Sequence, residues 1–160
     1  MTRHDFSDSF PSDPTDAAGE PIPHIDTAND PITGTEDLRQ RWRALMGPLG
    51  FSEALLWCVF IDDDGRIRPA LPRFELTAHP EPDYVDAIVE MLGSLVDDLG
   101  SVTVACLLTR PGNDGVSVGD LGWMRLITDA ARRHRLPLRP FHRANDVTLI
   151  TLDDLIDAVA

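Results

Sequence analysis

Two runs of eight residues constrain the fold more than any other part of this sequence. Residues 54–61 read Ala-Leu-Leu-Trp-Cys-Val-Phe-Ile, and residues 102–109 read Val-Thr-Val-Ala-Cys-Leu-Leu-Thr. Both runs are rich in strand-forming residues and almost wholly apolar, a composition that favours strands buried on both faces. We therefore expect both strands to lie in the interior of a sheet.

Three segments have the apolar spacing of amphipathic helices. They cover residues 36–46, with Thr35 as the expected cap, residues 83–99 and residues 117–135. The third opens with Ser117-Val-Gly-Asp120, the pattern of a capping box, in which the side chains of Ser117 and Asp120 accept hydrogen bonds from each other's backbone amides. Ser117 and Asp120 thus have a structural explanation that requires no chemistry.

The remaining apolar segments predict hairpins. Asp62-Asp63-Asp64-Gly65 favours a turn into a second strand over residues 66–76, which Pro69 and Pro72 should make irregular or place at a sheet edge. The three adjacent aspartates lack the alternating spacing of a calcium loop. Near the end of the chain, a strand over residues 138–143, a turn at Asn145-Asp146, a strand over residues 147–150 and a helix over residues 151–159 are expected.

The order of these segments predicts the fold class. Helices alternate with strands, which favours an α/β fold: a single-domain sandwich with a mixed sheet of about five strands flanked by helices, covering residues 35–160. Residues 1–34 hold seven acids, five prolines and Arg3 as their one basic residue, so we expect a disordered acidic tail, which is either a solubilising leader or an interaction segment.

Composition narrows the classes of function. A net charge of −13 argues against general nucleic-acid binding, and no apolar run is long enough to span a membrane. The first residues carry no secretory signal, so we expect a cytoplasmic protein, and the fourteen basic residues, all arginine, suggest a high-GC bacterial genome. Cys58 and Cys106 lie inside the apolar runs and should be core thiols; no disulfide, metal or cofactor is expected.

The loop between the strand at residues 102–109 and the helix at 117–135 is the best candidate site. Arg110 leaves a buried strand at its carboxyl end, where open α/β sheets bind ligands. The candidate ligand-binding residues are Arg110, Asn113, Ser117, Asp120 and His142, and none is assigned a catalytic role.

A basic patch near the end of the chain is a second feature. It consists of Arg132, Arg133, His134, Arg135, Arg139, His142 and Arg143. Strand alternation places Arg139, Phe141 and Arg143 on one side and His142 on the other, which splits the patch. We interpret it as a helix terminus next to a solvent-facing strand edge; an anion or nucleic-acid contact is the alternative.

Residues 84–152 resemble JAB/MPN domains, including their RadC-like bacterial members. The resemblance rests on Pro111, Ser117 and Asp120, within Arg-Pro-Gly-Asn-Asp-Gly-Val-Ser-Val-Gly-Asp. In that family two histidines on the strand join a Ser-x-x-Asp motif around a zinc ion that activates water. Leu108 and Arg110 stand where the histidines would be, so the resemblance implies a metal-free relative.

Two further resemblances concern the fold. The strand-helix-strand order looks like that of a STAS-type regulatory domain, without its Asp-Ser-Ser-Gly signature. The Leu-Trp, Asp-Gly, Arg-Pro-Gly and Trp123 landmarks are also similar to those of small bacterial α/β proteins, which implies no activity.

These observations favour a non-catalytic interaction or regulatory module with a protein partner or a second copy of the chain. The sequence shows no paired metal ligands, no Gly-x-Ser-x-Gly elbow and no glycine-rich phosphate loop. The alternatives are a small ligand-binding or anion-binding domain or enzyme that uses Arg110, and a STAS-like regulatory domain.

Overall fold

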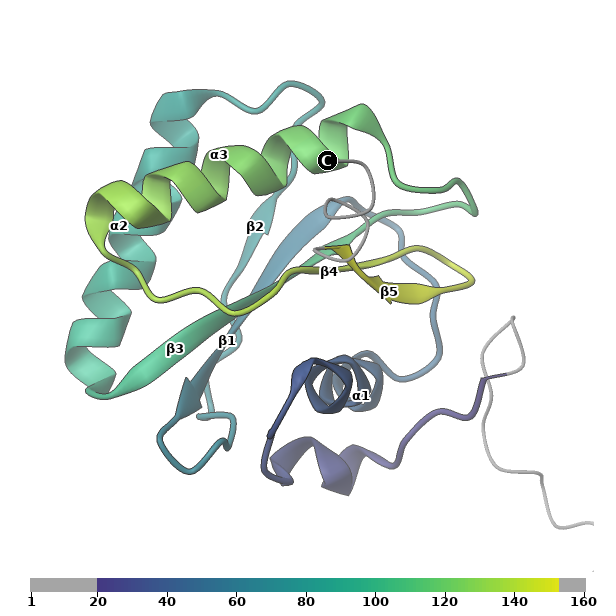
Figure 1. Ribbon diagram of the computed structural model, residues 1–160. Coiled ribbons are helices and arrows are strands. Elements are labelled where there is room, and N and C mark those ends of the chain that lie inside the picture. The colour runs from purple at the N-terminus through teal and green to yellow at the C-terminus, as the bar shows by residue number, and fades with distance from the viewer. Residues whose placement is uncertain (1–19, 153–160) are drawn as a thin grey trace, which may run out of the picture.

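The two apolar runs form neighbouring strands inside a mixed sheet. The computed structural model describes residues 20–152, and within them five strands pair in the order β2-β1-β3-β4-β5 (Figure 1). β1 and β3 are antiparallel, β3 and β4 are parallel, and β2 and β5 pair antiparallel with β1 and β4 at the two edges. Their bounds are β1 Leu55–Asp62, β2 Arg73–Glu75, β3 Val102–Thr109, β4 His142–Ala144 and β5 Leu149–Thr151.

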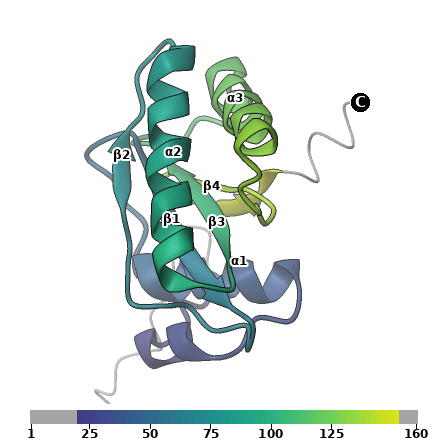
Figure 2. The ribbon, with the colours of Figure 1, turned by 90° about the vertical axis from the view of Figure 1, so that its left-hand side faces the viewer.

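Helices cover both faces of the sheet. α2 (Pro82–Leu99) and α3 (Val118–His134) lie side by side on one face, and α1 (Thr35–Met46) lies on the other with a short 3-10 helix, η2 (Ile25–Asn29) (Figures 1 and 2). The predicted α/β sandwich with a mixed five-stranded sheet is therefore confirmed. No helix between residues 20 and 152 has both the length and the apolar character needed to cross a membrane.

Alternate residues of the central strands feed two separate cores. On β1, Cys58 and Phe60 pack under α2 and α3, whereas Val59 and Ile61 pack under α1. Each core holds one fully buried tryptophan, Trp123 of α3 or Trp42 of α1. This alternation explains why the runs are apolar at almost every position, since each face of each strand meets a helix.

Cys58 and Cys106 face each other across β1 and β3. They are register partners, both are fully buried, and their sulfur atoms lie 3.8 Å apart as free thiols. The contact with the Cys106 thiol, followed by burial, raises the pKa of Cys58 well above its usual value. Cys58 is therefore protonated at neutral pH, as expected of a core thiol.

The 62–65 turn and the edge strand follow the predicted hairpin. The Gly65 amide donates to the Asp62 carbonyl at 2.9 Å, and Ile61 then pairs with Ile67. Pairing with β1 is interrupted between residues 69 and 72 and resumes in the three residues of β2, at the edge of the sheet. Pro69 and Pro72 have the expected effect, because proline has no amide hydrogen to donate to a strand.

The predicted acidic tail does not extend to residue 34. Residues 20–34 pack against α1: Ile32 is buried in the α1 core, η2 precedes it, and Arg39 forms an ion pair with Glu20. A few well-placed apolar residues, here Ala28 and Ile32, anchor a segment whose average composition is that of a disordered one. The remainder of the predicted tail, residues 1–19, lies outside the described residues.

The two ends of the domain differ from prediction in smaller ways. Thr35 is the first residue of α1 rather than its cap, and the cap is Gly34, which makes no side-chain hydrogen bond. Asp37 instead accepts hydrogen bonds from the amide and hydroxyl of Thr33, at 3.0 and 2.6 Å. The helix predicted over residues 151–159 falls almost entirely outside the described part of the chain.

Candidate functional site

The capping box predicted at the start of α3 is present. The Ser117 hydroxyl accepts from the Asp120 amide at 3.0 Å, and the Asp120 carboxylate accepts from the Ser117 amide at 3.0 Å. Both side chains of the motif are therefore engaged with backbone groups, and the helix begins at Val118.

Asp120 has a second role that the sequence did not indicate. Its carboxylate is fully buried and lies between two guanidinium groups: Arg110 bonds Oδ1, and Nε of Arg143 bonds Oδ2 at 3.0 Å. Burial acts to raise the pKa of Asp120, but the Ser117 amide and the two arginines outweigh burial and hold that pKa below its usual value. Asp120 is thus an ionised bridge between β3, α3 and β4.

The 110–116 loop is held from beneath by three residues that follow or belong to β4. The Asp114 carbonyl accepts from Arg143 Nη1 at 2.8 Å and from Asn145 Nδ2 at 2.7 Å. Asp146 accepts from the Gly112 amide at 2.7 Å, and its own amide donates to the Gly112 carbonyl at 2.8 Å. The loop itself is exposed at residues 111–115, so its backbone is fixed while its side chains face solvent.

His142 lies on the opposite face of the sheet from Asp120. It is fully buried under α1, near Arg39 and Glu36, whereas the next residue, Arg143, points to α3. Burial, and next the Arg39 guanidinium, lower the pKa of His142 to about 4. Neither ring nitrogen has a well-aligned hydrogen-bond partner among residues 20–152. His142 therefore does not converge with the rest of the candidate set.

The five candidates thus divide into three groups. Arg110 and Ser117 each bond Asp120, Asn113 is exposed in the loop, and His142 lies on the opposite face of the sheet. Arg143, Asn145 and Asp146, which organise the loop, were absent from the predicted site. Asn145-Asp146 was visible as a turn, but side-chain bonds to a loop some 30 residues earlier leave no local signal.

The interpretation of the basic patch requires correction. β4 is an interior strand between β3 and β5, and His142, Arg143 and Ala144 are all buried, so this part is no solvent-facing edge. The predicted alternation also fails before β4, where residues 139–141 leave the strand: Phe141 packs with α2 and α3, whereas Arg139 bonds Thr103 on the α1 side. At the end of α3, Arg133 pairs with Asp86 at 2.9 Å.

Comparisons with known proteins assign no family. The sequence matches no protein-family model, and no match is found among curated proteins. Within residues 20–152, no three His, Cys, Asp or Glu side chains are grouped in a way that could hold a metal ion. In a JAB/MPN site Asp120 would be a metal ligand, but here both of its oxygens accept hydrogen bonds from arginines.

Proposed function

We propose that this chain is a non-catalytic interaction or regulatory module, and that its contact surface is the 110–116 loop together with the exposed start of α3. One observation carries the proposal: an exposed loop is fixed by buried side chains. Arg143 and Asn145, each 3% exposed, direct their nitrogens to the Asp114 carbonyl. Burying a guanidinium beneath a loop is unfavourable unless its hydrogen bonds are satisfied, and here these bonds hold the loop in one shape.

A fixed loop suits recognition because less conformational entropy is lost on binding. Functional contacts concentrate on loops that a rigid scaffold positions. Beside this loop, Val118 is 88% exposed in the first turn of α3 and offers an apolar contact within a polar surround. The combination of a fixed polar backbone and an exposed apolar side chain fits a protein partner or a second copy of this chain.

The same geometry supports a binding role over a catalytic one. Arg110 and Ser117 are engaged with Asp120, and a buried, ionised Asp120 paired with two arginines is a poor proton acceptor. His142, the one histidine among the candidates, is on the other side of the sheet. The proposal places the module in the cytoplasm.

A pair of surface substitutions tests the contact surface. Val118→Asp changes the exposed residue beside the loop and keeps the fold, because an acid is favourable in the first turn of a helix. Met91→Asp is the matched control, an exposed apolar residue of α2, 52% exposed. We expect Val118→Asp to lose the partners that the full chain retains after cross-linking in cells, or to lose self-association in light scattering, while Met91→Asp keeps them.

Two results would contradict the proposal. One is recovery of the same partners in the same amounts with Val118→Asp as with the parent chain. The other is a parent chain that remains a monomer in light scattering and retains no partner after cross-linking.

A further inference from the structure

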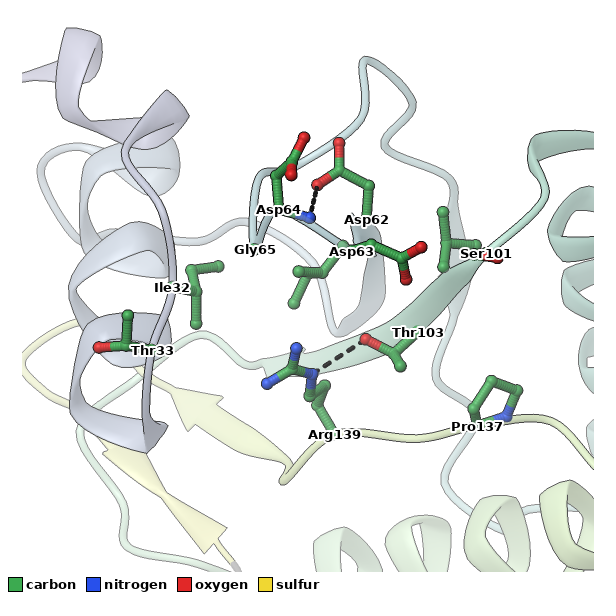
Figure 3. A pocket seen from close by; sticks show the side chains of 12 residues that line it. Ile32, Thr33, Asp62, Asp63, Asp64, Gly65, Ser101, Thr103, Pro137 and Arg139 are labelled. Carbon is green, nitrogen blue, oxygen red and sulfur yellow. Dashed lines mark hydrogen bonds between the residues drawn. The ribbon is translucent and has the colours of Figure 1, made fainter.

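A hollow of about 550 Å³ lies at the opposite end of β3 from the 110–116 loop (Figure 3). Its two sides are the 62–65 turn and Arg139, and apolar residues, including Ile32, Ile61 and Val102, line the space between them. Its volume is within the range of small-molecule sites, which run from about 300 to 1,000 Å³. We call it the Arg139 pocket.

Arg139 is held in place by hydrogen bonds from its side-chain Nε and from its backbone amide. Its Nε donates to the Thr103 hydroxyl at 2.9 Å, and its amide donates to the Val104 carbonyl at 2.8 Å. Its terminal nitrogens, Nη1 and Nη2, make no hydrogen bond or ion pair with residues 20–152, and Figure 3 shows the guanidinium extending toward the space between Ile32 and Asp63. Two parallel N–H groups of this kind match a carboxylate.

The opposite side of the pocket is a fixed acidic turn. Asp62 accepts hydrogen bonds from the amides of Asp64 and Arg66, both at 3.0 Å, so its role is to shape the turn. The carboxylates of Asp63 and Asp64 have no hydrogen bond or ion pair within the described chain. Gly65 has a φ of +80°, and a Cβ there would lie 2.7 Å from the Ile32 carbonyl oxygen, so the turn packs tightly against the neighbouring segment.

The positive charge of Arg139 and the negative charges of the 62–65 turn do not form an ion pair across the pocket. No ion pair joins Arg139 to Asp62, Asp63 or Asp64 among the contacts of residues 20–152, although all four line one pocket. An anion alone would meet repulsion from the acidic turn, and a cation alone would meet repulsion from Arg139. A molecule with both charges would satisfy both sides.

We infer that the Arg139 pocket binds a small zwitterion of the amino-acid type, with its carboxylate on Arg139 and its ammonium group at Asp63 of the acidic turn. The apolar lining suits a chain of methylene groups between the two charges. This site is independent of the 110–116 loop, so either proposal can fail without the other.

Three probes of equal chain length separate the contributions. 6-Aminohexanoate carries both charges, hexanoate lacks the ammonium group, and hexylamine lacks the carboxylate; shorter and longer ω-amino acids vary the charge separation. Titrations followed by ¹⁵N NMR should show amide shifts at Gly65, Thr103 and Arg139 with at least one ω-amino acid. That ω-amino acid should bind more tightly than both single-charge probes of its length.

Substitutions at the two sides of the pocket test which residues bind the carboxylate and which bind the ammonium group. Arg139→Gln should weaken binding of the best ω-amino acid by about tenfold or more and abolish its preference over the matching amine, because the charged fork for the carboxylate is lost. The double variant Asp63→Asn with Asp64→Asn should abolish the preference over the matching carboxylate. Arg132→Gln, which changes an exposed arginine of α3, should bind as the parent does.

The inference is overturned if no ω-amino acid of any length shifts these amides at millimolar concentration. It is equally overturned if a single-charge probe binds as tightly as its zwitterion, or if Arg139→Gln, shown to be folded by its NMR spectrum, binds as the parent does.

Discussion

His142 and Arg143 are neighbours on β4 that meet opposite electrostatic environments. Arg143 is buried as a charged group because Asp120 and the Asp114 carbonyl accept its hydrogen bonds. His142 is buried beside another cation, Arg39, so its neutral form is favoured. At the scale of single residues, β4 therefore stabilises the charged form of Arg143 and disfavours the charged form of its neighbour His142.

The buried imidazole predicts that acid begins to destabilise the fold at a pH above the range in which carboxylates titrate. The pKa of His142 in the folded protein, about 4, lies below the usual histidine pKa of 6.5, so the unfolded chain binds the proton more readily. The contribution of His142 to the free energy of unfolding is fully present above pH 6.5. It is lost as the pH drops from 6.5 toward 4, by about 3 kcal/mol in total. Urea denaturation at a series of pH values measures this loss.

His142→Leu removes the titrating group and should flatten the pH dependence of unfolding between pH 6.5 and 4. Leucine is similar in volume and leaves no buried polar atom unpaired, so the variant should remain folded at neutral pH. A variant that loses stability as steeply as the parent over this interval would show that another group is responsible.

Local contacts were predictable at the residue scale, and distant ones were not. The Ser117–Asp120 box follows from a spacing of three residues, which a helix start always brings together. The Arg143–Asp120 pair joins residues 23 positions apart. It depends on the register of the parallel pairing between β3 and β4, which no local sequence pattern predicts. The same limit explains why His142 was grouped with residues on the other face of the sheet.

At the scale of elements, the turn after β4 links two loops that are distant in sequence. Asp146 accepts from the Gly112 amide in the 110–116 loop and, at 2.8 Å, from the Phe51 amide in the segment between α1 and β1. One carboxylate thus positions both connections at this end of the sheet. The proposed contact surface depends on this bond as well as on Arg143.

Asp146→Ala should loosen both loops while leaving the sheet paired, because the bonds from Arg143 and Asn145 to the Asp114 carbonyl remain. We expect the amides of Gly112 and Phe51 to lose protection from hydrogen exchange, and the free energy of unfolding to fall by about 3 kcal/mol, because two hydrogen bonds to a charged group are lost. Asn113→Ala, in the exposed part of the same loop, is the control and should change neither. Unaltered exchange at Gly112 in Asp146→Ala would mean that the loop is held in another way.

At the scale of the whole molecule, residues 20–34 form part of the α1 layer. The Ile32 amide donates to the Gly65 carbonyl at 2.8 Å, Arg41 donates to the carbonyls of Asp30 and Pro31, and Ile32 itself is 5% exposed. The domain therefore begins at least fifteen residues before the predicted boundary. The segment also forms one edge of the Arg139 pocket.

Deletion of this segment should destabilise the domain. A chain that begins at Thr35 loses the buried Ile32 side chain, which contributes about 2 kcal/mol, in addition to the hydrogen bond from the Ile32 amide to the Gly65 carbonyl. Its urea midpoint should be clearly below that of a chain that begins at Glu20. Equal midpoints would mean that the segment is only loosely attached and that the boundary at residue 35 is adequate.

The architecture was more predictable than the boundary because it depends on repeated patterns. Each position of β1 and β3 contributes to the same conclusion, and α2 repeats its apolar stripe over five turns, so single exceptions do not change the fold class. The attachment of residues 20–34 depends on two side chains, Ala28 and Ile32, within a polar, proline-rich stretch. A composition average conceals such a small number of contacts.

The two facing thiols of Cys58 and Cys106 allow the rate of unfolding to be measured from their chemical labelling. Both are fully covered by α2 and α3, and the raised pKa of Cys58 keeps that thiol in its unreactive form while the core is closed. A thiol-alkylating reagent can reach them only when the sheet separates from those helices. When the reagent concentration makes labelling of the open form faster than reclosing, the rate of labelling equals the rate at which the molecule opens, with no probe added to the chain.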